Sequence, residues 1–131
     1  MLLAMALTNR PERFLKVNDL ENWNPIVDYH LMRTALRLGM VDLHGFETGK
    51  NKKRRWVGEI EENHIRTVVF DAISLLIELS SQPMSSVDVQ MWMARKYCPE
   101  MSKPNCKKCL FEKVCKKRIE LFQPIFRTIA Y

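Results

Sequence analysis

The chain has 131 residues, of which 47% are apolar and 27% charged, and its formal net charge is +6. This length suits one domain with one modest core. No apolar run approaches the ~18 residues that a membrane span requires, and no basic segment precedes the apolar start, so we expect neither a membrane helix nor a secretory leader. We therefore expect an intracellular, cytoplasmic protein with reduced thiols and no membrane partner.

Apolar residues recur at helical spacing along most of the chain, and no stretch alternates as a strand does. We therefore predict an all-α fold. The expected organisation is a single compact helical domain over 1–131. It would comprise an N-terminal helical segment (1–24), a helical core (25–97), and a metal-binding loop with a last helix (98–122).

The first helix of the core is expected to begin at Asn24-Pro25, because asparagine is a good N-cap and proline suits the first helical position. Gly39 is a typical C-terminal stop. Asp28 then falls in the first turn, where the helix dipole favours a carboxylate. The loop that follows contains a basic stretch at residues 50–55, which is either solvated or in contact with DNA backbone.

A long helix is predicted over about Glu59–Leu79, which has apolar residues at helical spacing and is followed by Pro83. Ser85-Ser86-Val87-Asp88 has the pattern of a cap for another helix, which would lead into Trp92. We expect Trp92 to pack in the core. A short last helix is expected between Leu110 and Phe122.

All four cysteines of the chain lie within 18 residues, with the spacing C-x7-C-x2-C-x5-C. Four thiols this close together indicate a metal site, and disulfides are disfavoured in a reducing compartment. Structural zinc sites usually pair two short knuckles, whereas this chain has one C-x2-C with wider arms that suit a larger [4Fe–4S] cluster. We expect such a cluster, with zinc as the alternative, on Cys98, Cys106, Cys109 and Cys115.

Positive charge is concentrated around these cysteines. From Arg95 to Arg118 the sequence has nine Lys or Arg against Glu100 and Glu112. This excess beside a metal site suggests phosphate backbone as the partner, while a solvated lysine-rich face is the alternative. The residues expected to contact DNA are Lys103, Lys107, Lys108, Lys53, Arg54 and Arg55.

Two segments carry a resemblance to a known family. Tyr97 to Cys115 resembles the cluster loop of the endonuclease III branch of the helix-hairpin-helix DNA glycosylases, whose signature is C-x6-C-x2-C-x5-C; here the first arm is one residue longer. Upstream, Val27-Asp28-Tyr29-His30-Leu31-Met32-Arg33 is similar to the family's V-D-T-H-x-x-R segment. The resemblance implies a structural [4Fe–4S] cluster, DNA as partner, association with the nucleoid, and base-excision repair.

In that family the aspartate of the second segment is the catalytic carboxylate. The resemblance therefore implies that Asp28 stabilises the oxocarbenium-like sugar as the N-glycosidic bond breaks, or activates the attacking water or amine. His30 and Arg33 match as well and would be supporting residues that orient the helix or contact backbone. An ordinary structural role is the alternative for each of the three.

The family's hairpin, with its L-P-G-[VI]-G turn and Schiff-base lysine, is not found. The 27 residues before Asp28 contain no glycine, and their sole lysine is Lys16. We therefore do not expect β-lyase activity, and an upstream domain or second chain would have to supply the hairpin. Three functions stay open: a DNA N-glycosylase-type enzyme, a non-catalytic nucleic-acid-binding module with iron–sulfur or zinc, and a zinc-bound adaptor for a protein partner.

Overall fold

The computed structural model describes residues 16–19, 22–44 and 57–121. These residues form α-helices α2 (Tyr29–Leu38), α4 (Glu59–Ser80) and α5 (Met84–Met93), and short 3₁₀ turns η2 (Ala94–Lys96) and η3 (Cys106–Lys108). No strand occurs among the described residues. The all-α prediction is therefore confirmed for this part of the chain.

Two expected features fall on residues that the structure does not describe. Most of the expected N-terminal helical segment lies there, and its described residues, 16–19 and 22–24, contain no α-helix. The basic stretch at 50–55 also lies outside the described residues, and with it the expected DNA contacts Lys53, Arg54 and Arg55.

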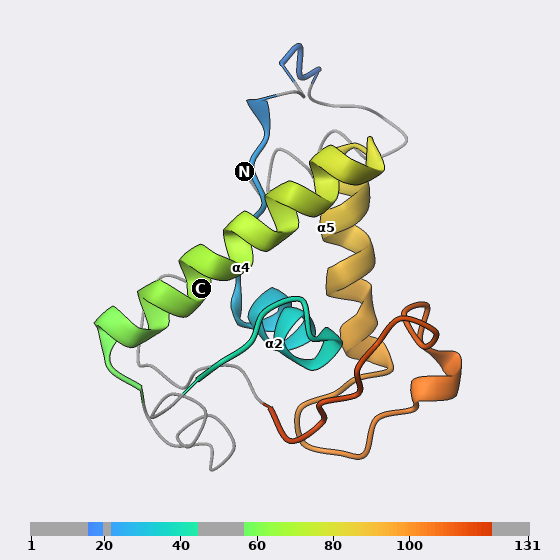
Figure 1. Ribbon diagram of the computed structural model, residues 1–131. Coiled ribbons are helices and arrows are strands. Elements are labelled where there is room, and N and C mark those ends of the chain that lie inside the picture. Colours follow the sequence, from blue (N-terminus) through green and yellow to red (C-terminus); the bar gives the residue numbers. More distant parts are fainter. Residues whose placement is uncertain (1–15, 20–21, 45–56, 122–131) are drawn as a thin grey trace.

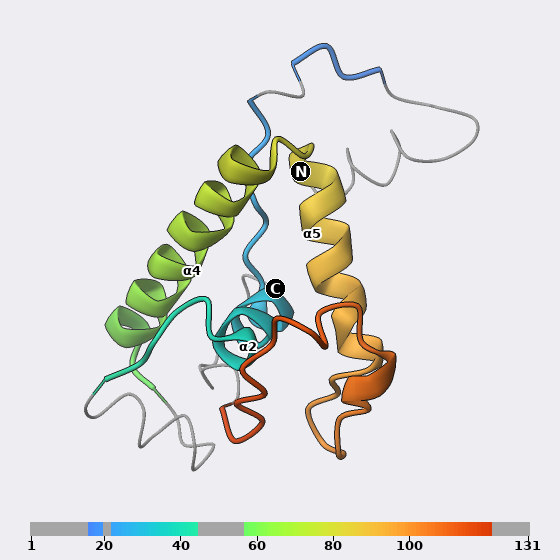
Figure 2. The same cartoon turned by 45° about the vertical axis from the view of Figure 1, so that its right-hand side comes forward.

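Helices α4 and α5 diverge from the turn at residues 81–83 like the arms of a V, with α2 between the arms toward their open end (Figure 1). Figure 2 shows the same arrangement after rotation, with the segment that follows η2 lying beside α2 and the C-terminal end of α5. Helix α2 contacts both α4 and α5. It is therefore the central element against which the rest of the described chain packs.

Both ends of α2 are capped. The side chain of Asp28 accepts the backbone N–H of Leu31 at 2.8 Å, which satisfies one of the free donors at the helix start. At the other end Gly39 takes the left-handed conformation, with φ at 78°, and its N–H bonds to Ala35 and Leu36 carbonyls. Every residue from 31 to 37 is buried, as expected for a helix enclosed by its neighbours.

The core lies where α4 and α5 face α2. Helix α4 contributes Ile65, Val69 and Ile73, which are one turn apart and therefore share one face. Its first turn carries three glutamates that favour the positive end of the helix dipole. Burying each such aliphatic side chain contributes about 1.5–3 kcal/mol. Trp92 packs against this core from its edge, as expected, and the Arg95 guanidinium lies over its ring.

The expected start of the first core helix is wrong. Residues 25–28 are not helical, α2 begins at Tyr29, and Asp28 is the N-cap itself. The reason is tertiary: the N–H of Ile26 donates to the carboxylate of Asp88 at 3.3 Å, and the Arg66 guanidinium donates to the carbonyl of Val27. The Val27 carbonyl is therefore bound by a distant side chain instead of a helical N–H, and the Ile26 N–H, which a helix start leaves without an intrahelical partner, is bound by Asp88.

Two other expected boundaries are also wrong. Helix α5 begins at Met84 with Pro83 as N-cap, and the Pro83 carbonyl accepts the N–H groups of Ser86 and Val87, so Ser85–Asp88 lie inside the helix. The last helix expected between Leu110 and Phe122 does not form over residues 110–121, which consist of turns and irregular chain. Residues 116 and 118 donate their N–H groups to α2 instead.

Over residues 16–19, 22–44 and 57–121, none of the helices combines the length and apolar character that crossing a bilayer demands.

Candidate metal centre

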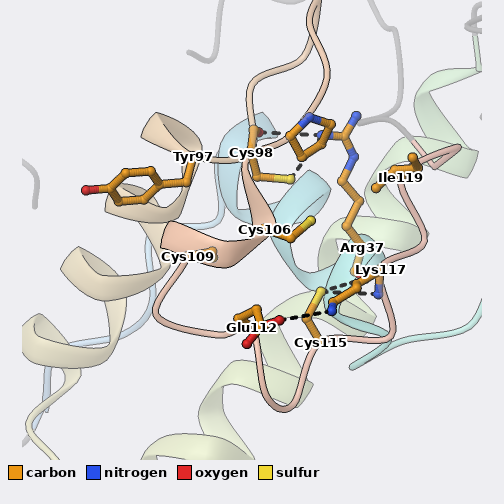
Figure 3. A pocket seen from close by; sticks show the side chains of 10 residues that line it. Arg37, Tyr97, Cys98, Cys106, Cys109, Glu112, Cys115, Lys117 and Ile119 are labelled. Carbon is orange, nitrogen blue, oxygen red and sulfur yellow. Dashed lines mark hydrogen bonds and ion pairs between the residues drawn. The ribbon is translucent and has the colours of Figure 1, made fainter.

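The four cysteines surround one hollow between the cysteine loop, which we define as residues 98–121, and α2. Cys98, Cys106, Cys109 and Cys115 all line it, together with Arg37 from α2 (Figure 3). None of the four thiols is in a disulfide, and each is partly exposed. The structure therefore places all four predicted ligands around the same hollow, although no three of the described side chains converge closely enough to bind one metal ion.

Backbone hydrogen bonds attach the cysteine loop to the C-terminal end of α2. The backbone N–H of Lys116 donates to the Leu38 carbonyl at 3.1 Å, and that of Arg118 donates to the Arg37 carbonyl at 3.2 Å. These are carbonyls that a helix end leaves without intrahelical partners. The positive side chains of this segment also suit the negative end of the helix dipole. The segment after Cys115 is therefore held against α2 by hydrogen bonds to the carbonyls of the last residues of the helix.

Arg37 is buried beneath the loop, with 3% of its surface exposed. Its Nε donates to the Leu121 carbonyl at 2.7 Å, and its Nη1 donates to the Pro99 carbonyl at 3.0 Å. The same Nη1 lies 3.2 Å from the sulfur of Cys98. Buried cations need such hydrogen-bonding partners to offset the loss of hydration.

The Cys115 thiol makes two hydrogen bonds to backbone groups. The N–H of Lys117 donates to its sulfur at 3.2 Å, and its thiol donates to the Arg37 carbonyl at 3.4 Å. Burial raises the pKa of this thiol, the Lys117 N–H opposes the rise, and the other three cysteines add to it. Metal binding at Cys115 therefore has to displace a proton that the protein environment retains.

The lysines that the sequence assigns to DNA lie on the outside of the loop. Lys103, Lys107 and Lys108 are all exposed, and the last two belong to η3 between Cys106 and Cys109. Their charges therefore face solvent within a few residues of the thiols, whereas Arg37 faces the hollow from the protein side.

The second predicted group lies along the first turns of α2. Asp28 is half-buried and caps the helix through Leu31. His30 is half-buried beside the Tyr29 ring, and its Nδ1 lies 3.1 Å from Nη2 of Arg33. This geometry makes Nδ1 the acceptor and leaves the ring proton on Nε2. Desolvation is the main reason why the pKa of His30 falls below its usual value, with Arg33 among the charges that lower it further.

Arg33 is almost fully buried, with 2% of its surface exposed, and its guanidinium lies 3.9 Å from the carboxylate of Glu100 in the cysteine loop. Burial is the main cause of the lowered pKa of Arg33, followed by the nearby charge of Arg37. The helix-orienting role expected for Arg33 is compatible with this placement. Asp28 and the four cysteines, by contrast, are not brought into one site, because Asp28 is not among the described residues that line the hollow.

Two residues of importance to this architecture were missed by sequence reasoning. Arg37 touches a predicted ligand directly, and Asp88 is buried and holds the segment before α2 through Ile26. A signal for Arg37 exists in the sequence: Arg33 and Arg37 are four residues apart within a mostly apolar segment, which places two cations on one face of a helix. No local pattern distinguishes Asp88 from a capping residue.

In the parts of the chain that the structure describes, no three side chains among His, Cys, Asp and Glu converge as ligands of one metal ion. Comparison of the chain with protein-family models, curated proteins and solved structures gives no match.

Proposed function

We propose that this chain is a DNA-binding iron–sulfur protein of the base-excision glycosylase type, with a [4Fe–4S] cluster on Cys98, Cys106, Cys109 and Cys115. The observation that carries the proposal is that all four thiols line a single hollow. Four thiolates are the donor set that such clusters require, and the same set could bind zinc. When bound, the cluster would serve as a rigid cross-link of the cysteine loop.

The surroundings of the thiols support a cluster. N–H groups point at two of the sulfurs, from Arg37 to Cys98 and from Lys117 to Cys115. Hydrogen bonds of this kind to ligand sulfurs compensate the negative charge of a thiolate-bound cluster and tune it. They are consistent with sulfurs that carry charge in the loaded protein.

The outer face of the cysteine loop supports nucleic acid as partner. Lys103, Lys107 and Lys108 are exposed, and no acidic residue separates them in the sequence. Exposed lysines can each neutralise a phosphate and release a counterion, which favours binding to DNA without regard to its sequence. A cluster behind them would fix the backbone on which they stand.

The glycosylase part of the proposal depends on Asp28. Its carboxylate lies at the N-terminus of α2, and in base excision it would stabilise positive charge that develops on the sugar as the N-glycosidic bond breaks. One observation favours a second function, a non-catalytic DNA-binding module: the same carboxylate already accepts the Leu31 N–H as a helix cap. In that case Asp28 is purely structural.

An assay on duplexes with oxidised or mismatched bases, using wild-type protein and Asp28→Asn, separates these functions. Asparagine is as good an N-cap as aspartate, so the variant should fold while losing the carboxylate charge. The enzyme proposal predicts base release by the wild type only, with equal DNA binding by both. Base release by neither protein, with DNA binding intact, would support the non-catalytic module.

A further inference from the structure

We propose that Arg37 is a positioning residue for the cysteine loop, which locks the first ligand in place and raises the reduction potential of the bound cluster through its hydrogen bond to the Cys98 sulfur. This inference rests on the proposed function, because it concerns the loaded centre. Arg37 is a buried cation, and its side chain bonds to the cysteine loop.

The contacts of Arg37 join the two ends of the cysteine loop. Its Nη1 bonds the Pro99 carbonyl at 3.0 Å and the Cys98 carbonyl at 3.5 Å, next to the first ligand. Its Nε bonds the Leu121 carbonyl at 2.7 Å, beyond the last ligand. One side chain thus fixes loop residues more than 20 positions apart to α2. In Figure 3 the Arg37 side chain runs along the hollow toward Cys98.

The backbone of the same residue anchors the segment that follows the last ligand. The Arg37 carbonyl accepts the Arg118 N–H at 3.2 Å; a neutral Cys115 thiol also donates to it at 3.4 Å, a bond that is lost when the thiol becomes a thiolate ligand. Residue 37 thus places Cys98, the first ligand in the chain, through its side chain, and the segment after Cys115, the last ligand, through its main chain. Ligands held in this way lose less conformational freedom when the centre forms.

The Nη1–sulfur contact of 3.2 Å has an electrostatic consequence. A guanidinium is permanently charged, and a charge-assisted N–H bond to a thiolate stabilises negative charge on the sulfur. Reduction adds an electron to the cluster, so the reduced state gains more from this bond than the oxidised state. Arg37 therefore shifts the potential in the positive direction.

The test compares reconstituted wild type with Arg37→Gln and with Arg118→Gln, a matched control. Arg118 also carries a positive charge beside the last ligand, but it pairs with Asp42 at the surface. The readouts are the reduction potential from anaerobic redox titration followed by EPR, and the iron retained per chain against a chelator. We expect Arg37→Gln to shift the potential to more negative values and to lose iron faster than both other proteins.

An equal potential in Arg37→Gln and Arg118→Gln would overturn the inference, because net charge alone would then explain any effect. If Arg37→Gln fails to retain a cluster, the wild type labelled with ¹⁵N-arginine supplies the second measurement. Pulsed EPR of its reduced cluster should show a nitrogen coupling that is lost in Arg37→Lys, and absence of the coupling in the wild type overturns the inference. A wild type that takes up no iron at all instead overturns the proposed function.

Discussion

Gly39 and Lys116 meet where α2 ends and the cysteine loop returns: a Cβ placed on Gly39 would overlap Cδ of the Lys116 side chain. The backbone of Lys116 is held at this point by its hydrogen bond to the Leu38 carbonyl. The residue that ends α2 is thus also the residue against which the segment after the last cysteine packs. A substitution at Gly39 should therefore affect both the end of α2 and the position of Lys116.

Gly39→Ala is therefore expected to destabilise the protein. The φ of 78° is left-handed, which costs a residue with a Cβ roughly 1–2 kcal/mol, and Lys116 must also move. Urea unfolding followed by circular dichroism measures the change. In the double variant Gly39→Ala/Lys116→Ala the crowding is relieved but the backbone cost remains, so partial recovery is expected. Full wild-type stability in Gly39→Ala would contradict the described conformation.

The buried carboxyl of Asp88 should make stability depend on pH. Burial is the main cause of its raised pKa, the Ile26 N–H opposes the shift, and the charge of Asp28 adds to it. Because the folded state binds the proton more tightly than the unfolded state, this stability contribution is present at low pH and is lost as pH rises through the folded pKa. Asp88→Asn keeps an oxygen that can accept the Ile26 N–H, and because an amide does not ionise, its stability should not fall with rising pH in this way.

We expect the melting temperature of Asp88→Asn to rise relative to wild type as the pH increases from about 4.5 to about 8, the range above the usual carboxyl pKa of roughly 3.9. Asp71→Asn serves as the control, since Asp71 is an exposed aspartate on α4. A difference between wild type and Asp88→Asn that is the same at every pH would contradict a raised pKa at Asp88.

The cap formed by Asp28 can be separated from its charge. Asp28→Ala removes the acceptor for the Leu31 N–H and should cost about 1 kcal/mol of folding free energy, whereas Asp28→Asn and Asp28→Ser should cost a few tenths. Thermal unfolding of the three variants gives the ranking. Equal stability of the alanine and asparagine variants would show that the 2.8 Å bond contributes nothing.

The lysines of the cysteine loop should control the salt dependence of DNA binding. Changing Lys103, Lys107 and Lys108 to glutamine should lower the slope of log affinity against log salt by about 0.9 for each phosphate that is no longer neutralised. Fluorescence anisotropy with a duplex at several salt concentrations measures it. Lys16→Gln, an exposed lysine outside the loop, should leave the slope unchanged. A triple variant with the wild-type slope would exclude this face as the DNA-binding surface.

Local patterns were sufficient where one element carried its own signal. The long helix was predicted to within one residue, because Ile65, Val69 and Ile73 recur at helical spacing before the break at Pro83. Gly39 was correctly predicted as a helix stop. All four cysteines line one hollow, as their short separation in the chain allows, and the metal site expected there stays a prediction.

Predictions failed where distant residues decide the local structure. Asn24-Pro25 has a good capping pattern, yet residues 25–28 are not helical, and Asp88 and Arg66 bind backbone groups of Ile26 and Val27. The segment after Leu110 has helix-compatible residues, but the N–H groups of Lys116 and Arg118 bond to carbonyls at the end of α2. Arg37 was missed for the same reason, since its partners are about 60 or more residues away in the sequence.

The most direct test of the proposed iron–sulfur centre is a metal and sulfide analysis of protein purified without oxygen. We predict a brown protein with broad absorbance at roughly 400 nm and about four iron and four sulfide per chain, the composition of one [4Fe–4S] cluster. Cys106→Ser should lose most of this iron. A colourless protein that carries one zinc per chain, with no sulfide, would contradict the iron–sulfur proposal.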